Sequence, residues 1–342
     1  MRLKDKIKFG TEIVKARLKD GYRVALSVYF FITYRCPLTC RYCNIINNAE
    51  EREELSTDKI LNLIDGMANS GVKKLHLTGG EPMVRDDIGE IINRAKEKGM
   101  FVGLSSSGYF IPEKVEALKD IDIVFLSFDG EEEIHDYARG KGSYQKLMEA
   151  MSVLKSRKIK FWTTTVINKT NRNSIDFILR VAKEKEFIAN FQILHSRDAD
   201  YRSCFLSEDD TVNFLMNSEE VKRIVFYLIE KKKQGEMIGT SLGYLNHLLN
   251  WDDYRIMYKK DSRMRCWAGR LYCYLEPDGM LYPCATLLEQ VAGQDAIRTG
   301  FKEAFNRLGD IPCQGCLSGC QTEQNLIFSL HLSTIMNWMR FI

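Results

Sequence analysis

Hydrophobic and polar positions alternate in blocks along the first 195 residues. Apolar runs rich in β-branched and aromatic residues predict buried strands at 22–34, 72–80, 100–108, 121–130, 159–168 and 189–195. Segments with apolar residues at helical spacing predict the intervening helices at 56–71, 87–99, 112–120, 143–158 and 173–186. Strands that alternate with helices form parallel sheets with right-handed crossovers. The pattern predicts an α/β fold, a partial (β/α)6 TIM-like barrel with its functional loops after the strands.

The rest of the chain follows a different pattern. The stretch CWAGRLYCYLEPDGMLYPC (266–284) predicts a β-hairpin with PDG as its turn, and a helical stretch follows at 297–309. We therefore expect a hairpin-plus-helix extension behind the barrel. The predicted segments are an N-terminal basic helix (1–22), the barrel (23–197), a helical bridge (198–262), the extension (263–325) and a C-terminal apolar helix (326–342).

Composition adds few constraints. The chain has 342 residues, of which 45% are hydrophobic and 28% charged, as in ordinary soluble globular proteins. A net charge of +3 is too small to indicate nucleic-acid binding, and no RNA-binding motif is visible. The apolar run at 24–34 is too short to span a bilayer and has no small-residue cleavage site after it. We expect neither a membrane span nor a signal peptide.

The ten cysteines are grouped rather than scattered. They lie at positions 36, 40, 43, 204, 266, 273, 284, 313, 316 and 320. Grouping of this kind, without a signal peptide, favours metal or redox chemistry in a reducing cytoplasm. We therefore expect a cytoplasmic protein.

The first group, in CPLTCRYC (36–43), follows the first predicted strand directly. A [4Fe–4S] cluster usually takes four cysteines. Three cysteines would leave one iron open to an exogenous ligand beside the barrel mouth. The alternatives are three buried cysteines, or a zinc site completed by a distant fourth ligand.

These residues resemble the cluster motif of the radical S-adenosylmethionine (SAM) superfamily, in which three cysteines, here Cys36, Cys40 and Cys43, hold the cluster. The segments TGGEP (78–82), SSSG (105–108), SFDG (127–130) and HDYARG (135–140) extend the resemblance over the barrel. Ser107 departs from the pattern, because many relatives have Asn there. The resemblance implies SAM contacts from Tyr42, Gly79, Gly80, Glu81, Pro82, Ser106, Ser127, Asp129 and Arg139.

The resemblance also implies roles for individual residues. Glu81 and the glycine backbone would hold the SAM amino group, with the glycines allowing close approach to the ligand. Arg139 would meet the SAM carboxylate, or alternatively pair at the surface with the acidic run 131–133. The serine turn at 105–108 would lie near the ribose or be a plain polar turn.

The implied chemistry is that of the superfamily. An electron from the cluster, supplied by a reductant such as ferredoxin or flavodoxin, cleaves SAM to methionine and a 5′-deoxyadenosyl radical. The radical abstracts hydrogen from a substrate, while the protein positions and shields the reactants.

The later cysteines resemble the SPASM and twitch extensions of radical SAM enzymes, which carry auxiliary iron–sulfur clusters. A full SPASM extension uses seven cysteines, whereas six occur here, so we expect one auxiliary cluster; zinc is the alternative. Cys273, in mid-strand, and the isolated Cys204 are expected to pack as small hydrophobic residues, with a ligand role as the alternative for Cys273. The candidate auxiliary ligands are Cys266, Cys284, Cys313, Cys316 and Cys320.

Three functions are then compatible with the sequence. The favoured one is an oxidoreductase that acts on a small-molecule or lipid-type substrate, with the auxiliary cluster as electron acceptor. The second is a peptide-modifying enzyme, which we rank lower because only 35 residues precede Cys36, too few for a separate peptide-recognition domain. The third is a non-catalytic iron–sulfur protein.

Both ends of the chain are amphipathic or apolar. The first 23 residues are basic and place Leu3, Ile7, Val14 and Leu18 on one helical face, and the last 17 are mostly apolar. We expect both ends to pack against the barrel. The alternative is peripheral association with a membrane.

Overall fold

In the computed structural model, the chain is described over residues 3–45, 53–195, 213–259, 264–287, 290–309 and 311–341. Cys204 and the first part of the predicted bridge, residues 198–212, lie outside this range. The main sheet has nine strands in the order β10-β9-β8-β1-β2-β3-β4-β5-β6. Its six consecutive parallel strands confirm the predicted α/β barrel.

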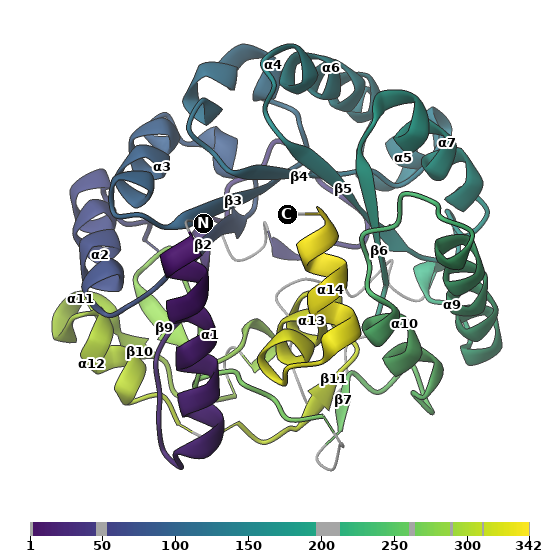
Figure 1. Cartoon of the computed structure of the whole chain (residues 1–342). Helices are drawn as coiled ribbons and strands as arrows, with labels where there is room; N and C mark the ends of the chain where they lie inside the picture. The colour runs from purple at the N-terminus through teal and green to yellow at the C-terminus, as the bar shows by residue number, and fades with distance from the viewer. Residues whose placement is uncertain are drawn as a thin grey trace.

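The barrel strands and their covering helices alternate along the chain. The strands are β1 (Ser27–Thr33), β2 (Lys74–Gly79), β3 (Phe101–Ser106), β4 (Ile123–Ser127), β5 (Phe161–Ile167) and β6 (Ile188–Ile193). The helices are α2 (Thr57–Asn69), α3 (Ile88–Glu97), α4 (Ile111–Lys114), α5 (Glu132–Arg139), α6 (Ser143–Ser156) and α7 (Ile175–Lys185). Figure 1 shows the strands as an arc with helices along its outer side.

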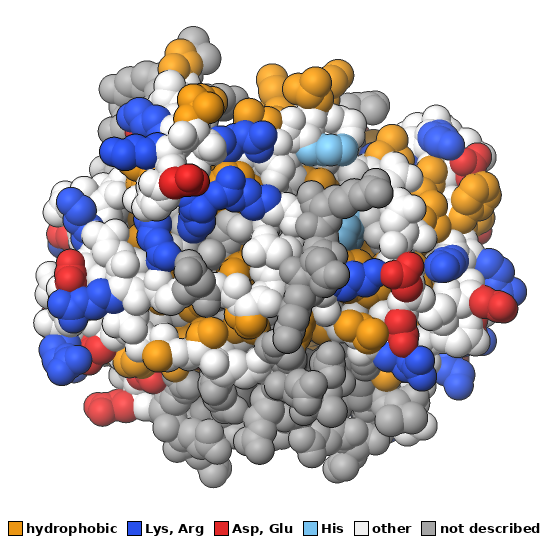
Figure 2. Space-filling model, turned by 90° about the horizontal axis from the view of Figure 1, so that it is seen from below, with side chains coloured by type: hydrophobic (Ala, Val, Ile, Leu, Met, Phe, Trp, Pro, Cys, Tyr) orange, Lys and Arg blue, Asp and Glu red, His pale blue; other side chains and the backbone are white. Residues whose placement is uncertain are grey.

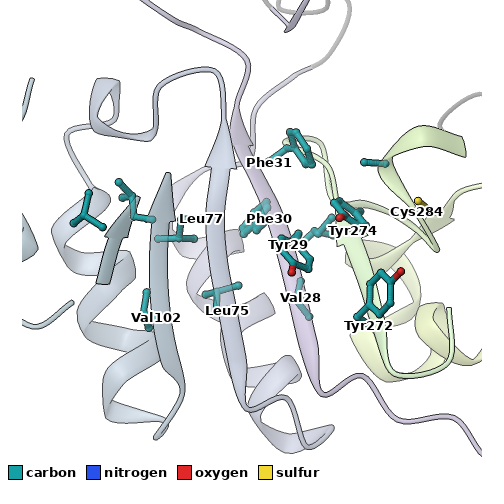
Figure 3. Packing of buried hydrophobic residues seen from close by; sticks show 14 of the residues in the cluster. Val28, Tyr29, Phe30, Phe31, Leu75, Leu77, Val102, Tyr272, Tyr274 and Cys284 are labelled. Carbon is teal, nitrogen blue, oxygen red and sulfur yellow. The ribbon is translucent and has the colours of Figure 1, made fainter. Parts of the chain in front are cut away.

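The burial of the strands explains why they could be predicted from apolar runs in the sequence. Every residue of β1 is buried, as expected for a strand covered on both faces. Val28 lies opposite Leu75, and Leu75 lies opposite Val102 on the next strand. Figure 3 shows these aliphatic side chains packed in the interior of the sheet. Burying each such side chain contributes roughly 1.5–3 kcal/mol.

Three helical details differ from the sequence prediction. Helix α5 was not predicted, because its eight residues, EEIHDYAR, carry five charged or histidine side chains and little apolar periodicity. The predicted helix at 112–120 is a short α4 followed by a 3-10 turn, η3 (Val115–Leu118). The predicted helix at 297–309 is broken into α11 (Ala296–Thr299) and α12 (Phe301–Asn306) by Gly300, whose φ is +81°.

The extension continues the barrel sheet instead of forming a separate one. The predicted hairpin consists of β8 (Tyr272–Leu275) and β9 (Met280–Tyr282), and β10 (Gln294–Asp295) follows. Strand β8 pairs with β1 in parallel, with Cys273 opposite Val28. The rings of Tyr29 and Tyr274 stack across this pair at 4.9 Å (Figure 3). The hairpin is therefore joined to the first barrel strand by both hydrogen bonds and packing.

The remaining elements close the open side of the arc. They are α1 (Leu3–Leu18), α9 (Ser218–Lys233), α10 (Leu242–Leu249), β7 (Tyr258–Lys259), η4 (Ala285–Leu287), β11 (Gly315–Cys316), α13 (Gly319–Phe328) and α14 (Leu332–Phe341). The predicted boundary between 325 and 326 falls inside α13, because that helix continues through the last cysteine segment. Among the described residues, no helix is both long and apolar enough to cross a bilayer.

Candidate functional site

The front loop, residues 36–43, leaves β1 and is anchored to the unpredicted helix α5. The backbone N–H of Arg41 donates to the carbonyl of Ala138 at 2.9 Å, and its guanidinium Nε donates to the carbonyl of Tyr137 at 3.1 Å. Inside the loop, the N–H of Cys43 donates to the carbonyl of Cys40 at 3.0 Å. Helix α5 therefore anchors the front loop at Arg41, between Cys40 and Cys43.

The three thiols of the front loop are free and half-buried. Burial raises the pKa of Cys36 to about 12 and that of Cys40 to about 11. Cys40 and Cys43 each add to the shift at Cys36, so the three sulfur atoms lie close enough to repel one another once charged. Thiolates in such a place need a nearby cation to offset their charge, which suits a metal-bound state.

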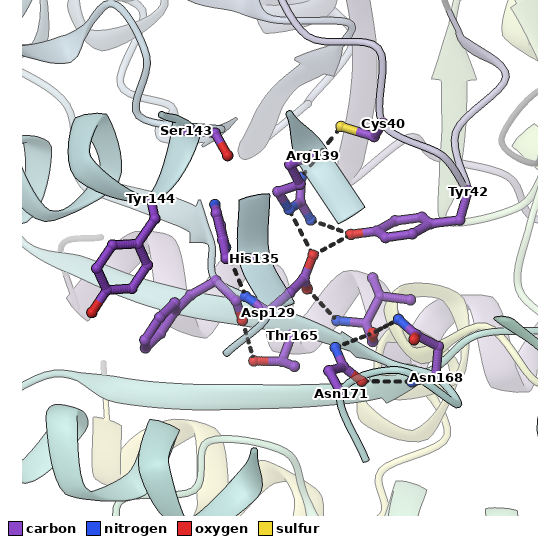
Figure 4. A network of polar contacts seen from close by, with 12 residues as sticks. Cys40, Tyr42, Asp129, His135, Arg139, Ser143, Tyr144, Thr165, Asn168 and Asn171 are labelled. Atoms are coloured by element: carbon purple, nitrogen blue, oxygen red, sulfur yellow. Dashed lines mark hydrogen bonds and ion pairs between the residues drawn. The ribbon is translucent and has the colours of Figure 1, made fainter. Parts of the chain in front are cut away.

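A polar network lies directly behind the loop (Figure 4). The buried Asp129 carboxylate accepts hydrogen bonds from Tyr42 and from Arg139 Nε, the latter at 2.7 Å. Arg139 Nη2 also donates to the Tyr42 hydroxyl at 2.6 Å, and Nη1 lies 4.0 Å from Cys40 Sγ. Burial disfavours the Arg139 charge, but Asp129 outweighs it, so the pKa of Arg139 stays well above its usual value.

This network corrects the predicted alternative for Arg139. Its ion-pair partner is the buried Asp129, not the acidic run 131–133 at the surface. The guanidinium is therefore a buried cation beside the thiols. The Asp129 backbone N–H also donates to His135 Nδ1 at 3.2 Å, so α5 contributes to the network from two of its turns.

Glu81 lies at the end of β2 and is buried against the serine turn. Its carboxylate accepts hydrogen bonds from Ser106 Oγ at 2.9 Å, from the N–H of Ser107 at 2.7 Å and from the Ser107 hydroxyl. The N–H of Met83 supplies a fourth donor at 3.2 Å. A carboxylate has about four acceptor positions. All are occupied, so Glu81 positions the serine turn, and an amino group would have to replace one of these donors.

Gly79 and Gly80 permit a close approach of the chain to itself. A Cβ atom at Gly79 would lie 2.2 Å from the carbonyl oxygen of Thr33, and one at Gly80 would lie 2.4 Å from that of Arg35. The N–H groups of Gly80 and Glu81 donate to these same two carbonyls at 2.8 and 2.9 Å. In the structure, the close approach at the two glycines is to the segment before Cys36. It ties residues 79–81, the GGE turn, to the front loop.

Three other predicted SAM contacts occupy the same end of the barrel. Ser127 ends β4, and Pro82 begins the 3-10 turn η2 (Pro82–Val84) after Glu81. Ser106 and Ser107 both donate to Glu81, so their hydroxyls already have partners within the chain.

The rear group consists of Cys266, Cys284, Cys313 and Cys316, which come from four separate positions around the hairpin and β11. Burial raises the pKa of Cys316 well above its usual value, and the other three cysteines raise it further. Cys266 likewise adds to the shift at Cys284, whose pKa rises to about 11. Cys284, Cys313 and Cys316 belong to the main hydrophobic core, and Cys266 packs against it. Polar contacts support them: Tyr272 OH lies 3.7 Å from Cys266 Sγ, and Thr286 Oγ1 lies 3.2 Å from Cys284 Sγ.

Cys320 lies in the first turn of α13, four residues after Cys316. Burial raises the pKa of its thiol, and the charge of Lys74 opposes that shift. Lys74 begins β2, and its ammonium lies 5.4 Å from the ring of Trp338. Cys273 is fully buried in β8, as predicted. Among the described residues, no three His, Cys, Asp or Glu side chains are arranged to hold a single metal ion.

Comparison with known proteins agrees with this geometry. The family model described as the Radical SAM superfamily matches residues 30–182, which include the front loop, the GGE turn and the Asp129–Arg139 network. The chain is a member of the radical SAM superfamily.

Relatives extend the similarity through the extension. The chain is 26% identical over 322 residues to the PqqA peptide cyclase of Bradyrhizobium diazoefficiens, covering 87% of this chain and 80% of that one. It is 26% identical over 278 residues to the AdoMet-dependent heme synthase of Methanosarcina barkeri, covering 75% of each. The structure of anSMEcpe with bound AdoMet superimposes with a TM-score of 0.64 at 17% identity, covering 91% of this chain and 98% of that one.

The comparisons confirm the enzyme class, the SPASM-type extension and the use of SAM with a [4Fe–4S] cluster. They weigh against the interpretation as a non-catalytic iron–sulfur protein. In this radical SAM enzyme, the front loop fits the cluster through its three free thiols and the buried cation of Arg139.

Two parts of the site were missed by sequence reasoning. One is α5 as the anchor of the front loop, for which the only signal was the acidic start and the Gly140 stop of the segment EEEIHDYARG. The other is Lys74, which faces the barrel interior near Cys320. Its position follows from strand register, which no local pattern reveals.

Proposed function

We propose that this radical SAM enzyme modifies a peptide, and that an auxiliary iron–sulfur cluster on the rear group accepts an electron during the reaction. The observation that carries the proposal is the similarity to a peptide cyclase over 87% of the chain, which is far more than the barrel alone. This reverses the order of preference based on the sequence, where a small-molecule substrate was favoured.

In this proposal Cys36, Cys40 and Cys43 hold the catalytic cluster, and Cys266, Cys284, Cys313 and Cys316 hold the auxiliary one. When bound, the catalytic cluster and SAM supply one-electron cleavage and hydrogen abstraction. The chain's own residues do the positioning. Arg139 offers a buried positive charge beside Cys40, and Asp129 and Tyr42 fix the direction in which its guanidinium points.

Glu81 has a supporting part in the same proposal. Through Ser106 and Ser107 it holds the end of β3, and through its own backbone it holds the segment before Cys36. SAM would therefore meet a surface whose two walls, the segment that leads into the front loop and the serine turn, are both held by Glu81, one through its backbone and the other through its carboxylate.

A second candidate is the small-molecule substrate favoured by the sequence. The similarity to an AdoMet-dependent heme synthase over 75% of the chain supports it. The two candidates share all of the machinery described above and differ in which molecule donates the hydrogen atom.

Deuterium transfer can distinguish them. Extract from cells grown in heavy water is separated into a peptide fraction and a small-molecule fraction, and each is incubated with reduced, reconstituted enzyme and unlabelled SAM. Deuterium in 5′-deoxyadenosine, measured by mass spectrometry, identifies the fraction that donates hydrogen. Transfer from the peptide fraction that is abolished by protease pretreatment is the expected result. Transfer only from the small-molecule fraction would reject a peptide substrate.

A further inference from the structure

The two terminal helices each expose an apolar stripe in addition to the face that packs on the barrel. On α1, Ile13 and Ala16 are buried, and Phe9 contacts the ring of Phe328 at 5.9 Å. The opposite face carries Ile7, Val14 and Leu18, which are 60%, 43% and 82% exposed. Their spacing of seven and four residues places them on one line along the helix. Packing against the barrel therefore accounts for only one of the two apolar faces of α1.

Helix α14 repeats this arrangement. Thr334 is fully buried, and the ring of Trp338 lies 5.6 Å from that of Trp162 inside the barrel. Leu332, Met336 and Met339 lie on the other side and are 74%, 69% and 76% exposed, with spacing of four and three residues. Exposed apolar residues are normal when single, whereas two aligned stripes on neighbouring helices indicate an interaction surface.

A cavity of about 1270 Å³ lies between the two helices. Arg17 and Leu18 at the end of α1 form one wall, and residues 330–333 at the start of α14 form another. Lys259, which also pairs with Asp252, and Arg265 line its far side. None of the described lining residues is acidic. Figure 2 shows Lys and Arg side chains gathered near hydrophobic ones that project from the upper edge of this face.

We propose that this end of the molecule binds the surface of a membrane that contains anionic lipids. The apolar stripes of α1 and α14 enter the interfacial layer, and the cationic cavity accepts a lipid phosphate. In Figure 1 both chain ends are drawn on the near side of the molecule, where α1 and α14 lie.

Charge and shape favour a membrane over other occupants. A symmetric contact with a second copy would bring Arg17 and Arg265 close to their own counterparts, which repel. A bound peptide is usually held in a concave apolar groove. Here the apolar side chains project outward from two helices, and the concave region between them is cationic.

Flotation with liposomes tests the proposal on the full-length protein. Vesicles of phosphatidylcholine are compared with vesicles that also contain phosphatidylglycerol, at low and high salt. We expect flotation only with the anionic vesicles and at least about a tenfold loss of the partition coefficient in high salt. Flotation that is equal with neutral vesicles, or absent with both, would overturn the proposal.

Matched variants locate the surface. Leu332→Gln with Met336→Gln, and separately Arg17→Glu with Arg265→Glu, should each lower partitioning about tenfold or more. Phe226→Gln is the control, because Phe226 is 58% exposed on α9, away from the cavity. All these positions are at the surface, so unchanged circular dichroism and Tm are expected. Equal flotation of all variants would overturn the proposal.

Two further measurements identify a competing occupant. Light scattering without vesicles would reveal a dimer that the Leu332→Gln variant disrupts, which would assign the face to a second copy. Inorganic phosphate that binds with the same affinity in the presence and absence of anionic vesicles would show that the cavity takes free phosphate and not a lipid. Either result would overturn membrane binding.

Discussion

The front loop and the rear group both bring thiols together, but they differ in the spacing of their cysteines along the chain and in the residues that surround them. The front loop carries its three cysteines on eight consecutive residues and is backed by a charged network of Tyr42, Asp129 and Arg139. The rear group draws four cysteines from separated positions, and they lie within the main hydrophobic core. A site that must admit a charged cosubstrate benefits from a cation in its wall, whereas a site that only exchanges electrons does not.

The largest expected difference concerns Cys40. Replacing it in Cys40→Ala should remove the catalytic cluster, lower the iron content by about half, and abolish the formation of 5′-deoxyadenosine. Iron analysis and chromatography of the products measure both effects. The control is Cys273→Ala, since Cys273 is buried in β8 outside either group. Full iron content in Cys40→Ala would show that the front loop holds no cluster.

Replacing a cysteine of the rear group should leave SAM cleavage intact, in contrast to Cys40→Ala. Cys284→Ala is expected to lose about half of the iron and to stop substrate turnover, while dithionite-driven formation of 5′-deoxyadenosine continues. Cys320→Ala should keep all of its iron, because Cys320 is not among the four ligands that we propose for the auxiliary cluster. Equal iron loss in the two variants would place Cys320 among the ligands.

The charged network behind the front loop should contribute strongly to the free energy of unfolding of the protein. Arg139→Gln leaves Asp129 buried without its cation and should lower the free energy of unfolding by about 3–5 kcal/mol. Adding Asp129→Asn should recover part of that loss. Urea denaturation followed by circular dichroism gives the values.

The control for this prediction is Arg157→Gln. Arg157 pairs with Glu116 at the surface, so its removal should cost less than about 1 kcal/mol. Similar costs at positions 139 and 157 would mean that the network contributes no more than a surface ion pair.

The smallest effect is expected at the edge of the rear group. Tyr272→Phe removes the hydroxyl 3.7 Å from Cys266 Sγ, and the loss of one polar contact to sulfur should lower the auxiliary potential by an amount on the order of tens of millivolts. Redox titration monitored by electron paramagnetic resonance measures it. Tyr254→Phe, whose hydroxyl instead donates to the carbonyl of Leu248, should leave the potential unchanged. A shift of equal size in both variants would argue against a local effect of Tyr272.

The barrel could be predicted because its signals are local. Each strand is a buried apolar run and most helices have clear periodicity, so all six strands were placed within a few residues. The front loop was equally clear, since three cysteines within eight residues need no tertiary information to be grouped. Helix α5 was missed because its polar sequence hides a structural role that depends on contacts with Arg41.

The rear group shows where sequence reasoning ends. Spacing identified five candidate cysteines but could not choose among Cys313, Cys316 and Cys320. Cys316 and Cys320 are four residues apart, yet the first lies in β11 and the second in the first turn of α13. Which of these thiols joins the other rear cysteines depends on tertiary packing, which spacing along the chain does not determine.

The pairing of β8 with β1 has a consequence for how the protein is made. Strand β1 leaves the ribosome early, but the strand that covers one of its edges begins only at Tyr272. During most of synthesis, a strand that is mostly apolar therefore keeps one row of backbone groups unpaired, which is the arrangement most prone to intermolecular pairing. A nascent chain stalled before the hairpin should depend on chaperones to stay monomeric. The extension thus protects the barrel by covering the free edge of β1 late in synthesis, whatever its cysteines bind.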